Sequence, residues 1–306
     1  MLQNYFRLQF KMGNRQLIEF GLPPIIAYVL AVITFVALSL YLWYKTPYAP
    51  YIYPFFALSG FTFLGNLGRN DFLKMCFSVR DYQKVRIAEN GIVALPFVLF
   101  LGYQREWLVS LTLILVAVIM ARWQSNNQWN YTLPTPFFHY PFEFLVGFRT
   151  TILLALFAYF LALKGISVGN FNLGLFSLFL LIGLSFSFYN QPESQLYVWI
   201  FDKRPAAFLW YKISIGFLYL TLLTIPLILL LLVYFPMHWL LIVGLHSIGF
   251  LYLSLVILAK YAAFPRAIHL PESLLIILSF VFPPLLLFTF PFFYKKAIQQ
   301  LNPLLL

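Results

Sequence analysis

Long apolar runs dominate this sequence, and its charged residues lie at the ends of those runs. Stretches such as Pro23–Trp43, Ile213–Tyr234 and Trp239–Ala259 each have roughly the 20 residues that an α-helix needs to cross the hydrocarbon core of a bilayer. Only 9% of the residues are charged and 62% are hydrophobic, whereas a water-soluble domain normally carries about 25% charged residues. The sequence therefore predicts an all-α polytopic membrane protein.

Eight predicted spans come in four pairs that are joined by short turns. The pairs cover residues 23–67, 91–121, 144–189 and 213–259. We expect a single transmembrane domain of two four-helix repeat units, about 1–123 and about 124–261, because each has a span pair, a charged segment and a second span pair in the same order. The similar sequences Val118–Trp123 and Val256–Tyr261 close the two units. Two units in the same orientation are a common transporter design.

Basic residues indicate the orientation of the chain. An interfacial amphipathic helix is expected over residues 3–20, with Arg7, Lys11 and Arg15 opposite its apolar side. If the predicted spans alternate in direction, fifteen Lys and Arg residues fall on the side of the N-terminus and three on the other. Since cytoplasmic loops carry the excess of Lys and Arg, we expect a multi-pass protein of the cytoplasmic (inner) membrane with a cytoplasmic N-terminus.

The C-terminal hydrophobic segment, residues 262–306, does not fit the pattern of paired spans. Its apolar run, about 272–294, is interrupted at its centre by Pro283 and Pro284, and proline breaks a helix. The run is either a ninth span or a re-entrant hairpin of two short arms. The side of the membrane on which the chain ends is left open.

Several classes of protein are excluded or disfavoured by composition and motifs. The net charge of +11 comes from short basic clusters beside apolar runs, which indicates contact with anionic lipid rather than nucleic acid. The single cysteine and the four histidines offer no metal-ligand spacing. No Gly-x-x-x-x-Gly-Lys-Ser/Thr phosphate loop is present. We expect no metal, no cofactor and no enzyme activity in this chain.

Residues 69–90 are the strongest candidate for contact with a partner protein. Five basic and three acidic residues alternate there with large apolar ones, more than a plain connector requires. Such a mixture suits a short helix that lies in a partner's cleft, and segment 190–212 has a similar character. The alternative is a solvated loop or contact with lipid headgroups. The candidate contact residues are Asp71, Phe72, Arg80, Asp81, Tyr82, Arg86, Glu89, Phe201, Asp202, Lys203 and Arg204.

His246 is the one ionisable residue that the sequence places deep in a predicted span. An ionisable group within the membrane is a candidate functional site, so His246 is a candidate for the substrate path. The alternative is a neutral histidine whose ring nitrogens are satisfied by Ser247 or by a helix carbonyl.

The order of an interfacial helix, two spans, a charged segment and further spans resembles that of ABC-type exporter permeases. The pattern Arg80-Asp81-Tyr82, followed by Arg86 and by Glu89-Asn90 before an apolar run, is most similar to Ecs-type permeases. The resemblance implies that segments 69–90 and 190–212 are coupling helices on a separate ATP-binding subunit, expected as a dimer that holds ATP and Mg. The chain departs from common exporter permeases in its larger number of predicted spans and in lacking a large extracellular domain.

The leading hypothesis is therefore the permease subunit of an ATP-driven exporter. Because few polar residues lie in the predicted spans, an apolar or amphipathic substrate is expected. All nine acidic residues lie at the ends of apolar runs or in loops, which counts against an ion-coupled secondary carrier. A non-transporting membrane scaffold or assembly subunit is the other alternative, and a homodimer of the chain is left open.

Overall fold

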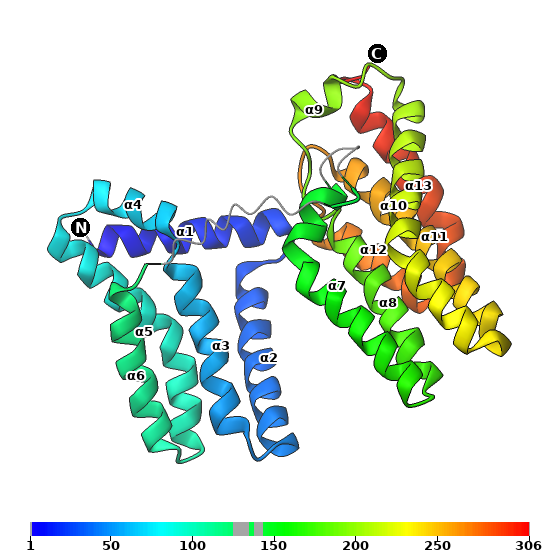
Figure 1. The fold of residues 1–306 in the computed structure, drawn as a ribbon. Coiled ribbons are helices and arrows are strands. Elements are labelled where there is room, and N and C mark those ends of the chain that lie inside the picture. The colour runs from blue at the N-terminus through cyan, green and yellow to red at the C-terminus, as the bar shows by residue number, and fades with distance from the viewer. Residues whose placement is uncertain (1, 125–134, 138–142, 306) are drawn as a thin grey trace. The chain divides into compact units, whose positions relative to one another are not determined.

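The structure, a computed structural model, describes residues 2–124, 135–137 and 143–305; these residues are mostly helical and contain no β-strand (Figure 1). The helices are α1 (Leu2–Phe20), α2 (Pro24–Lys45), α3 (Ala49–Leu64), α4 (Leu67–Cys76), α5 (Val79–Tyr103), α6 (Trp107–Arg122), α7 (Glu143–Ser167), α8 (Phe171–Ser187), α9 (Gln195–Trp199), α10 (Pro205–Tyr234), α11 (Trp239–Ala263), α12 (Leu270–Val281) and α13 (Leu286–Leu301). Two short 3-10 helices, η1 (Pro236–His238) and η2 (Pro283–Leu285), precede α11 and α13.

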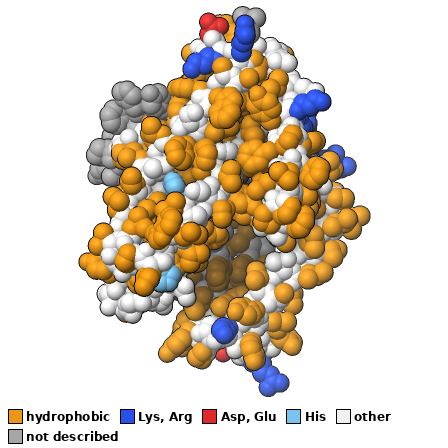
Figure 2. Space-filling model, turned by 90° about the vertical axis from the view of Figure 1, so that its right-hand side faces the viewer, with side chains coloured by type: hydrophobic (Ala, Val, Ile, Leu, Met, Phe, Trp, Pro, Cys, Tyr) orange, Lys and Arg blue, Asp and Glu red, His pale blue; other side chains and the backbone are white. Residues whose placement is uncertain are grey.

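In the part of the chain that the structure describes, five helices are long and apolar enough to cross a membrane, namely α2, α5, α7, α10 and α11. The three helices that correspond to the other predicted spans, α3, α6 and α8, contain 16 or 17 residues. On the face shown in Figure 2, hydrophobic side chains predominate, and the visible Lys and Arg side chains lie toward the upper and lower parts of the view. These features are those of a membrane protein, while the count of eight spans stays a prediction.

The chain folds into two compact units, residues 1–131 and 132–306. Each unit contains two long or medium apolar helices, then a short helix, then two more apolar helices. The boundary between the compact units follows Tyr131, and the division of the sequence into two repeat units stays a prediction.

The first unit consists of α1 and the helices α2–α6. In Figure 1, α1 runs across the ends of the other long helices of this unit, the position expected for an interfacial helix. Its Phe10 ring stacks on Tyr28 of α2. The core lies between α3, α5 and α6, where small residues permit close packing. A Cβ atom added to Gly60 of α3 would lie 2.8 Å from Val93 of α5.

The second unit is built around α11, which is buried along most of its C-terminal half. Small residues again mark the helix crossings. A Cβ atom at Gly249 of α11 would lie 2.7 Å from Ile182 of α8, and one at Gly147 of α7 would lie 2.3 Å from the Phe188 ring. Glycine at these positions therefore sets the separation of the helices.

The C-terminal segment folds as a hairpin of α12 and α13. The chain reverses at η2, which begins with the two prolines. Near the turn, Ser279 and Thr289 are within hydrogen-bond distance at 3.2 Å. Toward the open end, Lys296 Nζ lies 2.8 Å from a carboxylate oxygen of Glu272. The run is therefore not one straight span, and its re-entry into the membrane stays a prediction.

Candidate functional site

Four charged side chains of the second unit meet in its interior. Glu143 is the first residue of α7, Glu193 lies between α8 and α9, Lys212 is two turns into α10, and Lys260 is in the last turn of α11. Between 1% and 8% of each side chain is exposed. We call these four residues the second-unit cluster.

Each lysine of the second-unit cluster contacts both carboxyl groups. Lys212 Nζ lies 3.2 Å from Glu143 Oε1 and 2.5 Å from Glu193 Oε1. Lys260 Nζ lies 2.9 Å and 3.5 Å from the same two oxygens. Tyr261 donates a hydrogen bond of 3.0 Å to Glu193 Oε2. With two cations and two carboxyl groups the cluster is balanced, and a buried charge tolerates removal from water only when it is paired in this way.

The two carboxyl groups of this cluster differ in how they are held. Glu143 is part of a long helix, whereas Glu193 belongs to the connection between α8 and α9. Burial and the neighbouring carboxyl group of Glu143 raise the pKa of Glu193, while Lys260 and Lys212 act in the opposite direction. Glu193 is therefore the carboxyl group that a proton or a competing contact can separate more readily from the lysines.

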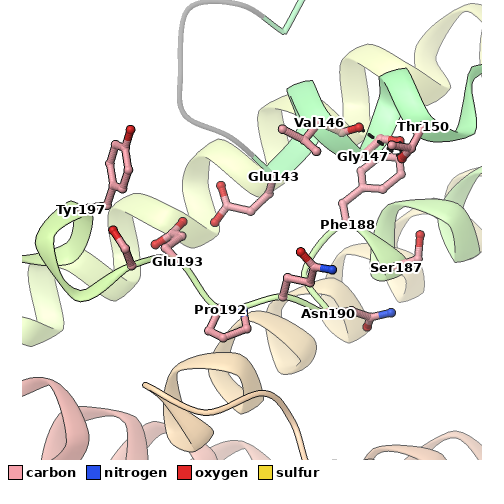
Figure 3. A pocket seen from close by; sticks show the side chains of 12 residues that line it. Glu143, Val146, Gly147, Thr150, Ser187, Phe188, Asn190, Pro192, Glu193 and Tyr197 are labelled. Carbon is pink, nitrogen blue, oxygen red and sulfur yellow. Dashed lines mark hydrogen bonds between the residues drawn. The ribbon is translucent and has the colours of Figure 1, made fainter. Parts of the chain in front are cut away.

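A pocket of about 490 Å³ adjoins the cluster, with Glu143 and Glu193 in its wall (Figure 3). Its other lining residues come from α7, the end of α8, the α8–α9 connection and α9, and most of them are polar. The hydroxyl groups of Thr150 and Ser187 donate to carbonyls of their own helices, so they present oxygen lone pairs to the pocket. The pocket gives water a route to the two carboxyl groups.

The first unit buries a different arrangement around Arg86 of α5. The Arg86 guanidinium is fully buried and donates to the carbonyl of Leu64, at 2.6 Å, and to those of Met120 and Trp123, at 3.3 and 3.4 Å. These carbonyls belong to the C-terminal ends of α3 and α6. Helix C-termini carry unpaired carbonyls and partial negative charge, which favours a cation there.

Glu89 of α5 links Arg86 to two further residues of the first unit. Arg69 of α4 forms an ion pair with Glu89, and Tyr5 of α1 donates a hydrogen bond of 2.5 Å to it. Arg69 also donates to the Tyr5 hydroxyl at 2.8 Å. Burial, and then the contact with Glu89, raise the pKa of Tyr5 to about 12, so Tyr5 stays a donor at neutral pH. Together, Tyr5, Arg69, Arg86 and Glu89 are the first-unit cluster.

Both short helices, α4 and α9, leave large apolar side chains exposed. On and beside α4 these are Phe72, Met75 and Val79. On and beside α9 they are Leu196, Tyr197, Trp199 and Ile200. Each short helix lies between two pairs of longer helices, so the two exposed apolar faces occupy the same place in the order of the two units.

The structure separates the predicted contact residues of segment 69–90 into two groups. Phe72 and Arg80 are exposed and Asp71 and Asp81 are partly exposed, with Asp81 at the start of α5, where the Ser78 hydroxyl donates to its carboxylate. Tyr82, Arg86 and Glu89 are instead buried in the first unit. The segment is not one helix in a loop: α4 ends at Cys76, and α5 then continues from Val79 into the apolar run. Because Tyr82, Arg86 and Glu89 are buried, any role of these residues in coupling to a partner would be indirect.

In segment 190–212 the predicted residues lie beside α9. Asp202 and Arg204 are exposed, whereas Phe201 and Lys203 are partly buried. Phe201 packs on Phe208 of α10, with ring centroids 5.3 Å apart. Lys203 Nζ lies 3.9 Å from the centroid of the Tyr211 ring. Contact with a partner stays a prediction for all four.

His246 links two helices of the second unit. Its two ring nitrogens lie 3.3 Å from the hydroxyl of Thr221 and 3.2 Å from that of Thr224, both on α10. Ser247, expected as a partner, donates to the carbonyl of Val243 instead. His246 does not line the pocket beside the second-unit cluster. The hydroxyl contacts support the alternative of a satisfied neutral histidine, although with different partners.

Two apolar grooves flank α2 in the first unit. One, of about 690 Å³, lies between α2 and α5 and includes Phe35, Pro96 and Tyr103. The other, of about 350 Å³, lies between α2 and α3 and includes Leu38 and Tyr53. Most side chains of α2 are exposed, so this helix contributes little to the core of its unit.

Sequence reasoning missed the second-unit cluster. Position at the end of an apolar run was interpreted as exposure, but Glu143, Lys212 and Lys260 are at such ends and are buried. The repeated sequence matches Lys260 to Arg122, but Arg122 is exposed, so the repeat carried no signal of burial. The cluster joins four segments that are far apart in the sequence, and contacts of this kind cannot be read from a single sequence.

Comparison with known proteins identifies no relative. No protein-family model, no curated protein and no solved structure matches this chain.

Proposed function

We propose that this chain is the membrane-embedded permease subunit of an ATP-driven transporter of the cytoplasmic membrane. A separate ATP-binding subunit, acting as a dimer, binds ATP and Mg and hydrolyses the nucleotide. It docks on the cytoplasmic side against α4 and the α9–Arg204 segment. The cargo is an apolar or amphipathic molecule that is exported.

One observation carries the proposal: each unit presents a short helix with exposed apolar side chains between two pairs of longer apolar helices. Lipid-facing helices also expose apolar side chains, but α4 and α9 are short and are flanked by partly or fully exposed charges, Asp71 and Lys74 in one case and Asp202 and Arg204 in the other. An apolar centre with a charged rim is the composition of a protein–protein contact.

The cavities support the class of cargo. The grooves beside α2 are lined by apolar side chains, whereas the pocket of the second unit has both polar and apolar residues in its lining. Both kinds of lining favour a molecule with an apolar part and a polar part over a purely apolar one.

The experiment is a pull-down of the tagged full chain from membranes in mild detergent. We expect an ATP-binding subunit to copurify with the wild type and to be lost with Met75→Asp on α4 or Trp199→Asp on α9. Met237→Asp is the matched control because Met237 is as exposed as Met75, at 93% and 85%, but lies in the turn between α10 and α11.

The outcomes separate the proposal from its alternatives. Copurification that survives both Asp variants would contradict docking on α4 and α9. If other membrane complexes stay intact and no ATP-binding subunit appears with the wild type, the permease proposal is wrong and a scaffold or a carrier takes its place.

A further inference from the structure

One acidic side chain of the segment that carries α9 contacts two of the long helices. Glu193 immediately precedes Ser194, the N-cap residue of α9. Its carboxyl group contacts Lys212 of α10 and both Lys260 and Tyr261 of α11. Two helices that the second unit packs side by side thus share one contact with the segment.

The segment also packs on the rest of the second unit through other side chains. Val198 of α9 is buried in the core, and Phe201 and Lys203 pack on rings of α10. Glu193 makes polar contacts with both helices, with Lys212 of α10 and with Tyr261 of α11. Glu193 is therefore placed to pass a displacement of α9 to both helices.

We propose that Glu193 is a positioning residue that ties the α9 segment to α10 and α11, so that movement of α9 under the ATP-binding subunit moves these two helices. The movement and its source rest on the proposed function. The tie itself does not, because it follows from contacts within this chain.

The surroundings of Glu193 suit a contact that breaks and re-forms. Glu143 also contacts both lysines, so the lysines keep one carboxylate when Glu193 leaves. The pocket on the other side of Glu193 provides space and water for the released carboxyl group. Full burial without such access would make separation of the charges far more costly.

The first unit holds its short helix in a corresponding way. Arg69 of α4 pairs with Glu89 of α5, so a partly buried ion pair joins the short helix to the longer helix that follows it. The signs are reversed, since the short-helix side contributes the cation in the first unit and the anion in the second.

The test is hydrogen exchange of the purified full chain in lipid nanodiscs. In Glu193→Gln, we expect the peptide covering residues 195–204 to exchange at least about tenfold faster than in the wild type, because a buried ion pair has been removed. The control is Glu272→Gln, which removes a lysine-paired carboxylate of α12 in the same unit and leaves this peptide unchanged. Equal exchange of the peptide in Glu193→Gln and the wild type overturns the tie.

A milder pair of variants covers the case in which Glu193→Gln does not fold. Tyr261→Phe removes only the hydrogen bond to Glu193 and is expected to raise exchange in residues 195–204 by a smaller factor. Tyr252→Phe, on the same helix, removes a buried hydrogen bond to the carbonyl of Ser279 and should affect α12 instead. The same response of residues 195–204 to both variants would contradict a tie that acts through Glu193.

A second readout distinguishes transmission of movement from local stability. In the complex with the ATP-binding subunit, a non-hydrolysable ATP analogue should change exchange in residues 195–204 and 256–263 of the wild type. In Glu193→Gln the change should be confined to residues 195–204. A change that still reaches α11 overturns transmission through Glu193, whereas failure to isolate any such complex counts against the proposed function and leaves the exchange test of the tie intact.

Discussion

The two units bury basic side chains near the ends of long apolar helices, but they compensate the charge differently. In the first unit Arg86 donates to three carbonyls at helix C-termini. In the second unit Lys212 and Lys260 are each paired with two carboxyl groups. A guanidinium carries five donors in a planar fork and can bond several neutral acceptors at once, whereas an ammonium is a compact charge that needs an anion when buried. Arg86 accordingly has its hydrogen bonds to carbonyls, and its one carboxylate neighbour, Glu89, is 4.0 Å away.

The difference has a consequence for movement. The carbonyls that hold Arg86 belong to the backbones of α3 and α6, so Arg86 fixes the ends of two helices. One of the anions that hold Lys212 and Lys260 belongs to a connecting segment, so that contact can be exchanged without disrupting a helix. We therefore expect the first-unit cluster to be the more rigid. Conformational change is expected at the second-unit cluster instead.

Of the two carboxyl groups that the lysines share, removing the one on a long helix should have the largest effect. Glu143→Gln leaves two buried lysines with one carboxylate, which we expect to lower the free energy of unfolding by about 3–5 kcal/mol. Thermal unfolding in detergent measures the loss. The double variant Glu143→Gln, Lys260→Met restores the balance of charge and should be less destabilised than either single variant; additive losses would show that the cluster is not one interacting unit.

Replacing the arginine of the first unit should have a somewhat smaller effect. Arg86→Met removes donors to three carbonyls and should lower the free energy of unfolding by about 2–4 kcal/mol, less than Glu143→Gln because the Leu64 carbonyl keeps the Asn70 side chain as a donor. Arg86→Lys should recover little of this loss, since lysine cannot reach the three carbonyls together. If Arg86→Lys recovered the full free energy of unfolding, an ammonium would serve at position 86 as well as a guanidinium. That result would contradict the difference that we draw between the two clusters.

Close helix packing should be equally sensitive in both units. Gly147→Ala and Gly60→Ala place a Cβ atom within 3 Å of a neighbouring side chain, and we expect each to lower the free energy of unfolding by about 1–3 kcal/mol. Gly183→Ala on α8 is the control because nothing lies within 4 Å of its added Cβ atom. In a helix that change should stabilise by about 0.5–1 kcal/mol. A loss at Gly183 as large as at Gly147 would exclude the packing explanation.

The smallest effect is expected at the contact of α1 with the first-unit cluster. Tyr5→Phe removes the hydroxyl that joins Glu89 and Arg69, a change of about 1 kcal/mol. Limited proteolysis within residues 2–20 should become faster without a large shift in global unfolding. Tyr44→Phe, at an exposed tyrosine of α2, should change neither quantity, and unchanged proteolysis in Tyr5→Phe would exclude this anchor.

Hydropathy was enough to predict the helical class and most of the helices, because membrane-length apolar runs have few alternatives to helix. It was less informative where polar and apolar residues mix. Residues 69–90 were predicted as one contact segment. In the structure, exposed apolar side chains and apolar side chains that are buried in the first unit alternate along it. Leu73 and Tyr82 are buried, and Phe72 and Met75 are exposed.

The charge clusters could not be predicted because their members are far apart in sequence. Glu143 and Lys260 are separated by 117 residues, and each alone has the features of a solvated residue at the end of a span. Their burial depends on the helix crossings set by residues such as Gly147 and Gly249. The prolines at 283 and 284 carried a stronger local signal, and the hairpin of α12 and α13 follows from it.

The most direct test of the account uses Cys76, the single cysteine of the chain, which is exposed at the end of α4. A membrane-impermeant maleimide should label Cys76 in inverted membrane vesicles only after peripheral subunits have been stripped by alkaline washing, and should not label it in intact cells. In a Cys76→Ser background, Ile200→Cys beside α9 should show the same protection. Labelling of intact cells, or labelling rates that stripping leaves unchanged at both positions, would contradict α4 and α9 as the docking sites of an ATP-binding subunit.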